Sequence, residues 1–404
     1  MEKIITKLTN FTELAYKRNP DTPRTALNLT MSLNNQNSKP GVNSLMSRLF
    51  MQGTKTRSAE QLAQELDEYA IEFSSEIRPD YLKFKIVCLN EDFQKAVEIL
   101  TDIVKNTTFA DFEKEKIKLA GEISAELDSP RAKLTDCYYK NMYENHPYGY
   151  TNTVVLENLD NISKEEVIKS YESILNDSKK VISVVGDLEF DFIKQILEKS
   201  FDDLPVSNDI SLNLNIAKSE NKKEITIVKE DLNQAHIIKG WLVGGASSAD
   251  YPTLALLNII LGASGLSSRL FLELRDKKGL AYVVRSSYDT AGLAANFSIY
   301  IATEPKNIET SLDGFEKELE KIKNVLVSDE ELENAKNNLF GKWAFISETN
   351  SQQANWLSHY GVSGLGFDFF SEAQKKVKAV TAEDIQNCAK KYLDDKYVQV
   401  ILKP

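Results

Sequence analysis

The sequence predicts an α/β (α+β) fold made of two homologous domains, and two internal matches indicate the duplication. The segment 41–50, GVNSLMSRLF, returns at 262–271 as GASGLSSRLF, with Gly, Leu, Ser, Arg, Leu and Phe in the same places. The segment 162–167, ISKEEV, returns at 380–385 as VTAEDI at nearly the same separation. Two matches in the same order, each separated by a little over half of the 404 residues, indicate a repeated unit of about 200 residues, a usual domain size.

Strand-like and helix-like segments alternate along the first half. Ser58 and Gln61 have the spacing of a capping box, which satisfies free backbone amides where a helix begins. Residues 145–149, NHPYG, are expected to end a long helix. The expected strands are 25–33, 70–78, 81–89 and 181–185, and the expected helices are 41–51, a segment from 58, 91–105, 111–143 and 163–174.

The second half repeats this plan. Residues 205–222 are polar, rich in Asn and Ser, and lack a helical period, so we expect a linker there. The predicted domains are therefore 1–204 and 223–404. The expected strands are 224–228, 235–243, 282–288, 295–302 and 398–402, and the expected helices are 251–261 and 266–275, followed by four more that end near 392.

Composition limits the classes of partner. Apolar residues make up 42% of the chain and charged residues 27%, which is ordinary usage for globular proteins. The net charge of −11 argues against nucleic acid or an anionic membrane as a partner, because either would require a basic face. Residues 375–378, KKVK, lie among acidic residues and indicate a solvated helix rather than a binding patch.

The cysteines and the N-terminal segment indicate a reducing compartment. Cys88, Cys137 and Cys388 are widely spaced and form no C-x-x-C pair, which is typical of free thiols rather than of disulfides or a metal site. The first residues, MEKIITKLTNF, lack the apolar segment of a signal peptide, and no apolar stretch reaches membrane-spanning length. These features predict a cytoplasmic protein.

Five groups of residues together resemble a known family. They are the helix at 41–51 followed by Gly53-Thr54, the turn His146-Pro147-Tyr148-Gly149, the pair Gly186-Asp187, the segment Gln234-Ala235-His236, and the run from Ser268 to Tyr282. The chain resembles, over nearly its whole length, the M16 metallopeptidases, which include mitochondrial processing peptidase, pitrilysin and insulysin. This resemblance implies two M16-type domains, each a mixed β-sheet covered by helices, that face each other as a clamp.

Active members of this family carry a zinc motif, H-x-x-E-H, on the helix before the Gly-Thr pair. Histidines four residues apart share one helix face and bind zinc, and the glutamate between them activates the metal-bound water. The matching residues here are Ser44, Ser47 and Arg48. The resemblance therefore implies a degenerate motif and no cofactor in this chain, because hydroxyls do not replace the lost ligands and Arg48 would repel a cation.

A downstream glutamate completes the zinc site in the family. Glu122 matches that position, and Glu115 lies earlier on the same expected helix. We interpret both as remnants rather than as part of a working metal site, because solvated or salt-bridged glutamates are common on helices. The chain's three histidines, His146, His236 and His359, have no second histidine three or four residues away, and we expect structural roles for His146 and His236.

The second half keeps a pair of residues that the family uses in catalysis. In family members, an arginine holds the substrate backbone and a tyrosine seven residues later donates its hydroxyl to the oxyanion. Arg275 and Tyr282 match this spacing. A phenol directed at developing negative charge lowers the reaction barrier. The alternative is a surface arginine paired with Asp276 or a neighbour and a tyrosine packed at the start of a strand.

A chain that has lost the zinc half of a site and kept the oxyanion half is expected to act in a two-chain enzyme. In bacterial relatives, one subunit carries H-x-x-E-H and a similar partner carries the Arg/Tyr pair. The resemblance thus implies a non-zinc subunit of a heterodimeric M16 peptidase. Such a subunit is inactive alone, with zinc in its partner and an unfolded peptide as substrate, which would add a strand to an exposed sheet edge.

Two other hypotheses stay open. The chain could be an inactive M16-like scaffold or peptide-binding protein, homodimeric or part of a larger complex, in which Arg275 and Tyr282 have no active partner. It could also be an autonomous peptidase with an unusual metal site. Gly244-Gly245 and the segment 262–265 are candidates either for close approach of another backbone or for ordinary turns.

Overall fold

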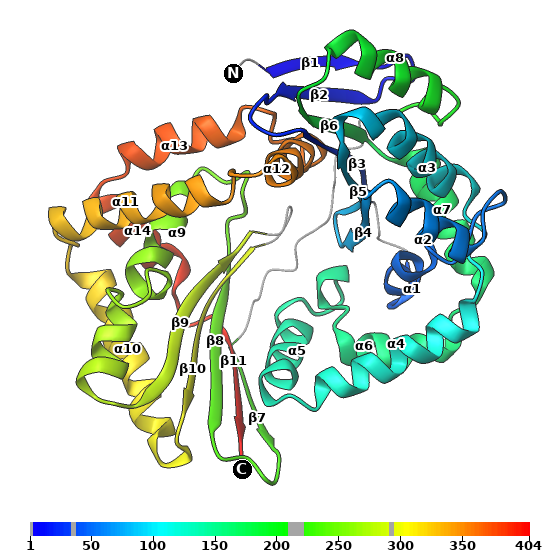
Figure 1. The fold of residues 1–404 in the computed structure, drawn as a ribbon. Helices are drawn as coiled ribbons and strands as arrows, with labels where there is room; N and C mark the ends of the chain where they lie inside the picture. Colours follow the sequence, from blue (N-terminus) through cyan, green and yellow to red (C-terminus); the bar gives the residue numbers. More distant parts are fainter. Residues whose placement is uncertain (1–2, 34–37, 209–221, 291–294) are drawn as a thin grey trace. The chain divides into compact units, whose positions relative to one another are not determined.

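The computed structural model of the chain describes residues 3–33, 38–208, 222–290 and 295–404. Within these residues the chain forms one six-stranded and one five-stranded β-sheet, each covered by helices (Figure 1). The predicted α/β class with two similar parts is confirmed. No helix in the described ranges is long and apolar enough to cross a membrane, and the three cysteines are free thiols.

The first compact unit consists of Met1–Glu122, Val155–Leu214 and Phe345–Phe369. Its strands, in the sheet order β1-β2-β6-β3-β5-β4, are β1 (Lys3–Lys7), β2 (Glu13–Arg18), β6 (Lys180–Gly186), β3 (Arg24–Ser32), β5 (Tyr81–Leu89) and β4 (Glu72–Arg78). Its helices are α1 (Val42–Leu49), α2 (Ala59–Glu68), α3 (Phe93–Asn106), α7 (Lys164–Asp177), α8 (Phe190–Phe201), α12 (Asn350–Val362) and most of α4 (Phe112–Leu127) and α6 (Asn152–Asn158).

The second compact unit consists of Ile123–Val154, Asn215–Ala344 and Phe370–Pro404. Its strands, in the order β7-β11-β8-β10-β9, are β7 (Lys223–Val228), β11 (Val398–Lys403), β8 (Ala235–Val243), β10 (Ala295–Thr303) and β9 (Ala281–Asp289). Its helices are α5 (Pro130–Met142), α9 (Tyr251–Asn258), α10 (Ile308–Asn324), α11 (Asp329–Phe345), α13 (Phe369–Ala379) and α14 (Ala382–Tyr392), with two π-helical segments, η5 (Ile259–Ala263) and η6 (Phe271–Lys277).

The two sheets share one topology. The order β7-β11-β8-β10-β9 repeats the order β2-β6-β3-β5-β4 strand for strand, so that β1 is the only addition in the first sheet. In each repeat the first strand pairs in parallel with the last strand, and the remaining pairs are antiparallel. The duplication that the internal sequence matches predict therefore has a direct counterpart in the strand order.

Local sequence signals position several elements as expected. The capping box of α2 is present: the Ser58 hydroxyl accepts a hydrogen bond from the Gln61 amide, and the Ser58 amide donates to the Gln61 side chain. Strands β4 and β5, expected at 70–78 and 81–89, pair in antiparallel register around a turn at Pro79-Asp80. These features depend on neighbours in sequence, which is why sequence patterns predict them.

Other elements differ from the prediction. The expected helix 111–143 is two helices, α4 and α5, because Pro130 begins α5 and proline is tolerated only in the first turn of a helix. The last part of the chain holds five helices, α10 to α14, rather than four. The strands β1 and β2 and the helix α6 were not predicted, since each is only five to seven residues long. Helix α8 was also not predicted, although Ile193, Leu197 and Phe201 form a buried stripe along it.

The break at Pro130 matters because α5 packs on a sheet from the other half of the sequence. Helix α5 lies against β8 and β11 of the second unit, whereas α12, its counterpart in the repeat, lies against β3 and β6 of the first unit (Figure 1). The compact units therefore depart from the expected ranges 1–204 and 223–404 by one exchanged segment in each direction. Most of the expected linker 205–222 lies outside the described residues.

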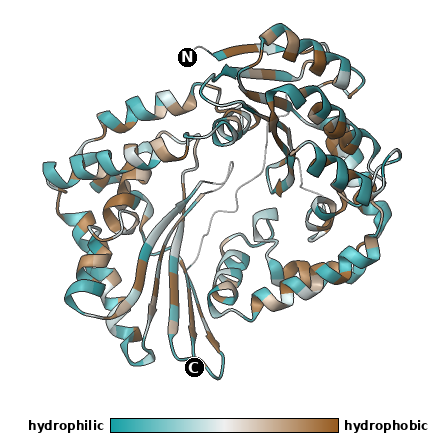
Figure 2. Ribbon diagram, in the orientation of Figure 1, coloured by the Kyte–Doolittle hydropathy of each residue, from teal (hydrophilic) through white to brown (hydrophobic). Residues whose placement is uncertain are grey.

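The sheet of the first unit has two unlike faces. One face is apolar and packs beneath α1, α3 and α7, with Leu29, Phe84 and Val184 fully buried. Phe50 at the end of α1 packs edge-on against Phe84, with ring centroids 4.7 Å apart. Figure 2 shows the same division along the helices of this unit, where brown stretches alternate with teal ones. Burial of this face supplies most of the driving force for folding of the unit.

The opposite face, beneath α12, carries small and polar side chains. Ser183 donates its hydroxyl to the Ala354 carbonyl at 2.7 Å, and the Lys83 ammonium donates to the Asn355 side chain at 2.7 Å. Lys83 is fully buried. Burial lowers the pKa of Lys83 to about 7, and the nearby carboxylate of Glu76 only partly opposes this effect. Burial of this amine in its charged form lowers the stability of the folded state.

The corresponding face of the second unit is more apolar. Tyr138 on α5 is fully buried and lies directly over Gly240 of β8. A Cβ atom at position 240 would lie 2.0 Å from the Tyr138 hydroxyl oxygen, so only glycine lets the helix approach this closely. The apolar residues around this contact include Leu134, Met142, Ile238, Val398, Val400 and Leu402.

The buried amine of Lys83 gives a prediction about stability. Lys83→Met keeps most of the side-chain volume and removes the amine. The folded pKa is about 7 and the unfolded value about 10.5, so the unfolded chain binds more protons between these values and the wild type gains stability as pH rises through them. We expect the variant to be more stable by roughly 2–4 kcal/mol at pH 7 and below, with the difference shrinking toward pH 10.5.

Urea denaturation at several pH values measures this difference. Lys85→Met is the matched control, because Lys85 lies on the same strand face but is partly exposed and paired with Glu76. A stability difference for Lys83→Met that does not change with pH would contradict the assignment of a buried amine with a depressed pKa.

Candidate functional site

Helix α1 positions the residues that match the zinc motif. It begins after Gly41, which has a φ angle of 96° in the left-handed region that favours glycine. A side chain at Gly41 would also meet Ile162 at 2.8 Å. Val42, Leu45, Met46 and Leu49 are buried, so the alternate helix face with Ser44, Ser47 and Arg48 is half-exposed.

The Ser47 side chain and the carbonyls of Ser44 and Ser47 take part in local hydrogen bonds. The Ser47 hydroxyl donates to the Ser44 carbonyl at 3.0 Å, and the Ser75 hydroxyl on β4 donates to the Ser47 carbonyl at 2.9 Å. The Ser47 hydroxyl thus closes a local turn of the helix. Neither contact resembles the arrangement of metal ligands or of a general base.

Arg48 joins α1 to both glutamates of α4. Its Nε lies 3.1 Å from a Glu115 carboxylate oxygen, and its two terminal nitrogens lie 2.8 Å from the two oxygens of Glu122. Glu115 is buried and also accepts a hydrogen bond from Lys118 at 2.6 Å. The hydrogen bonds with Glu122 raise the pKa of Arg48 and lower the pKa of Glu122. A permanent cation therefore occupies the space between the two remnant glutamates.

These residues do not fit a zinc ion. Zinc sites in proteins use imidazole, thiolate or carboxylate ligands in a near-tetrahedral set, and only the carboxylates remain here. Both carboxylates already bind a guanidinium whose charge would oppose a metal cation. Throughout the described ranges, no group of three or more His, Cys, Asp or Glu side chains is placed to hold a metal ion.

The second half of the chain contains the same pairing. Arg269, which matches Arg48 in the repeat, donates from Nε and a terminal nitrogen to Glu331 of α11 at 2.7 and 2.6 Å. Helix α11 follows α10 as α4 follows α3, so the two arginine–glutamate pairs are equivalents. The recurring S-R-L-F sequence thus has a structural reason, because its arginine ties the segment that carries it to a later helix, α4 in the first unit and α11 in the second.

Arg275 and Tyr282 come together in the second unit. Arg275 lies in the π-helical segment η6, a kind of element that is frequent at functional sites. Its guanidinium carbon lies 4.7 Å from the centre of the Phe271 ring and 4.8 Å from the centre of the Tyr282 ring. Such stacking orders the guanidinium while its N–H groups stay available to a ligand.

Tyr282 occupies an irregular position on the edge strand β9. In the pairing with β10, Ala302 lies opposite Val283 and Thr303 lies opposite Ala281, so Tyr282 is the extra residue of a β-bulge. Bulges redirect side chains and are frequent next to active sites. The Tyr282 side chain is 77% exposed, which differs from a tyrosine packed at the start of a strand.

In the part of the chain that the structure describes, neither the Arg275 nor the Tyr282 side chain has a polar partner. No ion pair joins Arg275 to Asp276 there, and no hydrogen bond is made by the Tyr282 hydroxyl. The contact between the two side chains is the cation–π stack. An exposed tyrosine ordered by an arginine is a suitable donor to a substrate bound from outside this unit.

The three histidines lie apart from these residues. His146 accepts a hydrogen bond from the Tyr148 amide at 3.2 Å, and burial lowers its pKa. His236 shares a hydrogen bond of 2.8 Å with the Tyr300 hydroxyl. His359 packs edge-on against Tyr81, and burial together with the Lys83 charge lowers its pKa to about 4. All three contact aromatic side chains, as in ordinary packing.

Glycines of the candidate segments have separate structural roles. A Cβ at Gly262 would lie 2.1 Å from the Ser286 amide nitrogen, so glycine lets η5 approach the backbone of β9. Gly265 has a φ of 77° and forms a turn. Gly244 lies against Ser248, and a Cβ atom at position 244 would lie 2.4 Å from the Ser248 hydroxyl oxygen. Each contact is made within the second unit.

Sequence reasoning missed a group of side chains around Tyr300 of β10. The guanidinium carbons of Arg131 and Arg285 lie 5.4 and 5.8 Å from the centre of its ring, and His236 bonds to its hydroxyl. Arg285 and Tyr300 are direct neighbours across β9 and β10. Strand alternation alone could have placed Arg285 and Tyr300 on one face, but Arg131 comes from the exchanged helix α5.

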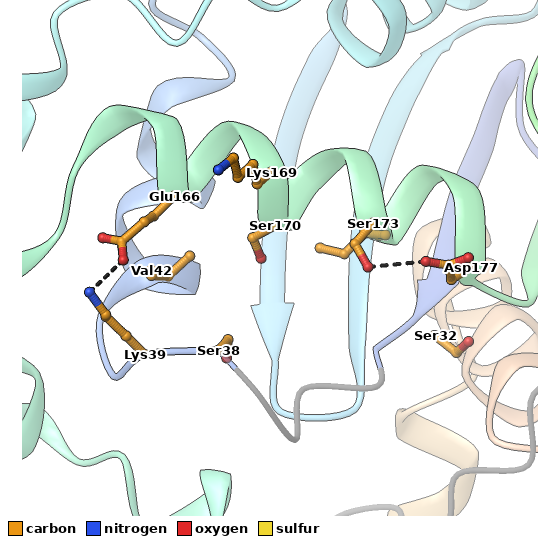
Figure 3. A pocket seen from close by; sticks show the side chains of 10 residues that line it. Ser32, Ser38, Lys39, Val42, Glu166, Lys169, Ser170, Ser173 and Asp177 are labelled. Carbon is orange, nitrogen blue, oxygen red and sulfur yellow. Dashed lines mark hydrogen bonds and ion pairs between the residues drawn. The ribbon is translucent and has the colours of Figure 1, made fainter.

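A separate cavity in the first unit contains none of the predicted site residues. It has a volume of about 350 Å³ and lies beside α7 (Figure 3). Lys39 pairs with Glu166 across it, and the Ser173 hydroxyl donates to Asp177 at 3.2 Å. Among its lining residues, Lys39 and Glu166 thus neutralise each other, whereas Lys169 makes no ion pair with another described residue.

The duplicated units, the helix before Gly53-Thr54 and the Arg275–Tyr282 pair define a protein with the architecture of a two-domain peptidase, in which Ser44, Ser47 and Arg48 occupy the positions of the zinc motif. Residues 14–153 match the family model described as insulinase (peptidase family M16), and residues 161–339 match the model described as peptidase M16 inactive domain. The chain belongs to the M16 peptidase family.

Relatives and solved structures agree with this assignment. The chain is 26% identical to a Bacillus subtilis protein named uncharacterized zinc protease YmxG, with 98% of this chain and 97% of that protein covered. It is 27% identical to an uncharacterized zinc protease of Rickettsia felis, with 99% and 97% covered.

Among solved structures, the fold is similar to a peptidase M16 inactive domain from Pseudomonas fluorescens, with a TM-score of 0.89, 20% identity, and 100% of this chain and 98% of that chain covered. It is also similar to a protease from Helicobacter pylori, with a TM-score of 0.90, 20% identity and full coverage of both chains. These similarities establish the fold.

The Arg48 ion pairs give a prediction about metal binding. We expect the purified wild-type chain to hold well below one zinc per molecule, because its motif residues are not ligands. Combining Ser44→His, Ser47→Glu and Arg48→His next to Glu122 should create a site that binds about one zinc per chain. Equilibrium dialysis followed by metal analysis measures both values.

The control adds Glu122→Gln to the triple variant, which should remove most of the gained zinc because it deletes the third ligand. One tightly bound zinc per wild-type chain would contradict the conclusion that Arg48 takes the place of the metal.

Proposed function

We propose that this chain is the non-zinc subunit of a heterodimeric M16 zinc peptidase. It supplies Arg275 and Tyr282 to the zinc site of a similar partner chain that carries H-x-x-E-H, and an unfolded peptide is the substrate. The observation that supports this most strongly is the ordered, exposed Arg275–Tyr282 pair, in which Tyr282 is 77% exposed and stacks on Arg275.

The chemistry of the pair suits acyl transfer. When water attacks a peptide carbonyl, the carbonyl oxygen gains negative charge. A hydroxyl donor fixed near that oxygen binds it more strongly in the transition state than in the ground state. Tyr282 would donate this hydrogen bond. Arg275, with its N–H groups free of protein acceptors in the described residues, would hold a carbonyl of the substrate backbone.

The first unit of this chain does not supply the other half of such a reaction. The Arg48 guanidinium binds Glu115 and Glu122, and Ser47 stands where a general base would be needed. Zinc chemistry would therefore come from the partner subunit, whose metal activates the water. This chain's own groups bind and orient the peptide and stabilise charge on it.

Removal of the Tyr282 hydroxyl tests the role of that side chain. In the complex with its H-x-x-E-H partner, Tyr282→Phe should lower kcat by roughly tenfold to a thousandfold, the range found for loss of one oxyanion donor. Assembly should be unchanged, because the ring that stacks on Arg275 is kept. Peptide hydrolysis assays and size-exclusion chromatography measure the two effects.

Tyr397→Phe is the matched control, since it removes a hydroxyl that bonds to Glu224 near the opposite edge of the same sheet. Unchanged turnover for Tyr282→Phe would assign this residue to packing and contradict the proposed role.

Native mass spectrometry of the tagged chain, purified from its own organism, tests the assembly. A complex of roughly twice the chain mass that contains a similar polypeptide with H-x-x-E-H supports the proposal. Recovery of the chain only as a monomer or homodimer would contradict it and favour a scaffold or peptide-binding protein.

A further inference from the structure

The face of the second sheet that α5 covers carries two arginines beside one tyrosine ring. Arg131 belongs to the first turn of α5, Arg285 to β9, and Tyr300 to β10, so three elements contribute. The two guanidinium carbons lie 5.4 and 5.8 Å from the centre of the Tyr300 ring. Tyr300 is 8% exposed, whereas both arginines are exposed.

The surroundings of this arginine pair contain no acidic partner. Among the described residues, neither Arg131 nor Arg285 forms an ion pair or a side-chain hydrogen bond. This differs from Arg48, Arg57 and Arg269, each of which binds at least one carboxylate. Two unpaired guanidinium groups that share one ring are also notable in a chain whose net charge is −11.

Helix α5 adds positive potential at the same place. Its first turn contains no acidic residue, and the Ser129 side chain does not cap it. A helix N-terminus favours an anion and disfavours a cation such as Arg131. The Tyr300 hydroxyl, in turn, is bonded to His236. The arrangement thus gathers N–H donors and positive charge and leaves them without an acceptor.

We infer that Arg131 and Arg285, held against Tyr300, form a binding site for a carboxylate of a bound peptide. Guanidinium groups match carboxylates through paired N–H donors, and stacking on an aromatic ring fixes the plane of those donors. The carboxylate belongs either to an acidic side chain or to the C-terminus of the peptide, and both present the same chemistry to the two arginines.

The position of this site on β9 sets its distance from Tyr282. Arg285 lies three residues along the strand, and a strand rises about 3.3 Å per residue. A peptide extended along β9 with a carbonyl at Tyr282 would therefore place a carboxylate at Arg285 about three residues from that carbonyl. This part of the inference rests on the proposed function, because it assumes that Tyr282 contacts the reacting carbonyl.

Binding of matched peptides to the full chain alone tests the site without any proteolysis. The probes are short fluorescein-labelled Ala/Ser/Gln peptides with an amidated C-terminus that contain either one Glu or one Gln, and a third Gln peptide with a free C-terminus. Fluorescence anisotropy at low ionic strength measures Kd. We expect a peptide with the recognised carboxylate to bind roughly tenfold to a hundredfold more tightly than the amidated Gln peptide.

Arg131→Gln and Arg285→Gln should each reduce this preference and leave the affinity of the amidated Gln peptide unchanged. Lys317→Gln is the matched control, because it makes the same charge change on α10, where Lys317 is exposed and paired with Asp313. A preference for Glu assigns the site to an acidic side chain, and a preference for the free C-terminus assigns it to the terminal carboxylate.

Equal affinities for all three peptides, no binding of any peptide, or a preference that both arginine variants retain would overturn the inference. These results are distinguishable from failure of the proposed function. A carboxylate preference that depends on Arg285, in a chain that forms no heterodimer, keeps the site and removes the peptidase role. Loss of turnover in Tyr282→Phe without any carboxylate preference keeps the peptidase role and removes the carboxylate site.

Discussion

The positive charge of Arg48 determines what the first unit can do. Two carboxylates from α4, one of them buried, face the helix that carries the degenerate motif. Buried carboxylates require a cation or hydrogen-bond donors, and a metal ion meets this requirement in a zinc site. Here the Arg48 guanidinium meets this requirement. The two helices remain joined without a metal and without the chemistry that a metal supplies.

The same interaction recurs in the second unit, where Arg269 binds Glu331 of α11. The pair therefore belongs to the duplicated architecture and is not specific to the degenerate motif. An arginine at this helix position is compatible with the fold in both halves, whereas a histidine would be useful only where further ligands surround it.

The exchange of α5 and α12 links the two units in sequence and sets which side chains lie on each sheet. Each sheet keeps one apolar face for its own helices, and its second face receives a helix from the other half of the chain. In the second unit this helix brings Arg131 to Tyr300 and Arg285. A binding feature of that sheet therefore depends on a residue from the first half of the sequence, and separate expression of either half would lose it.

The sequence by itself determined the features that depend on neighbours along the chain and on residue type. Internal repetition predicted the two matching sheets, local patterns predicted the capping box at Ser58 and most strands, and the residues at 44, 47 and 48 predicted a degenerate zinc motif. Only the tertiary structure decided which helix covers which sheet, because the exchange of α5 and α12 depends on contacts between distant segments. The fold likewise set the pairing of Arg48 with two carboxylates, the bulge at Tyr282 and the gathering of Arg131 and Arg285 around one ring. Side-chain proximity across elements is set by packing and not by spacing in sequence.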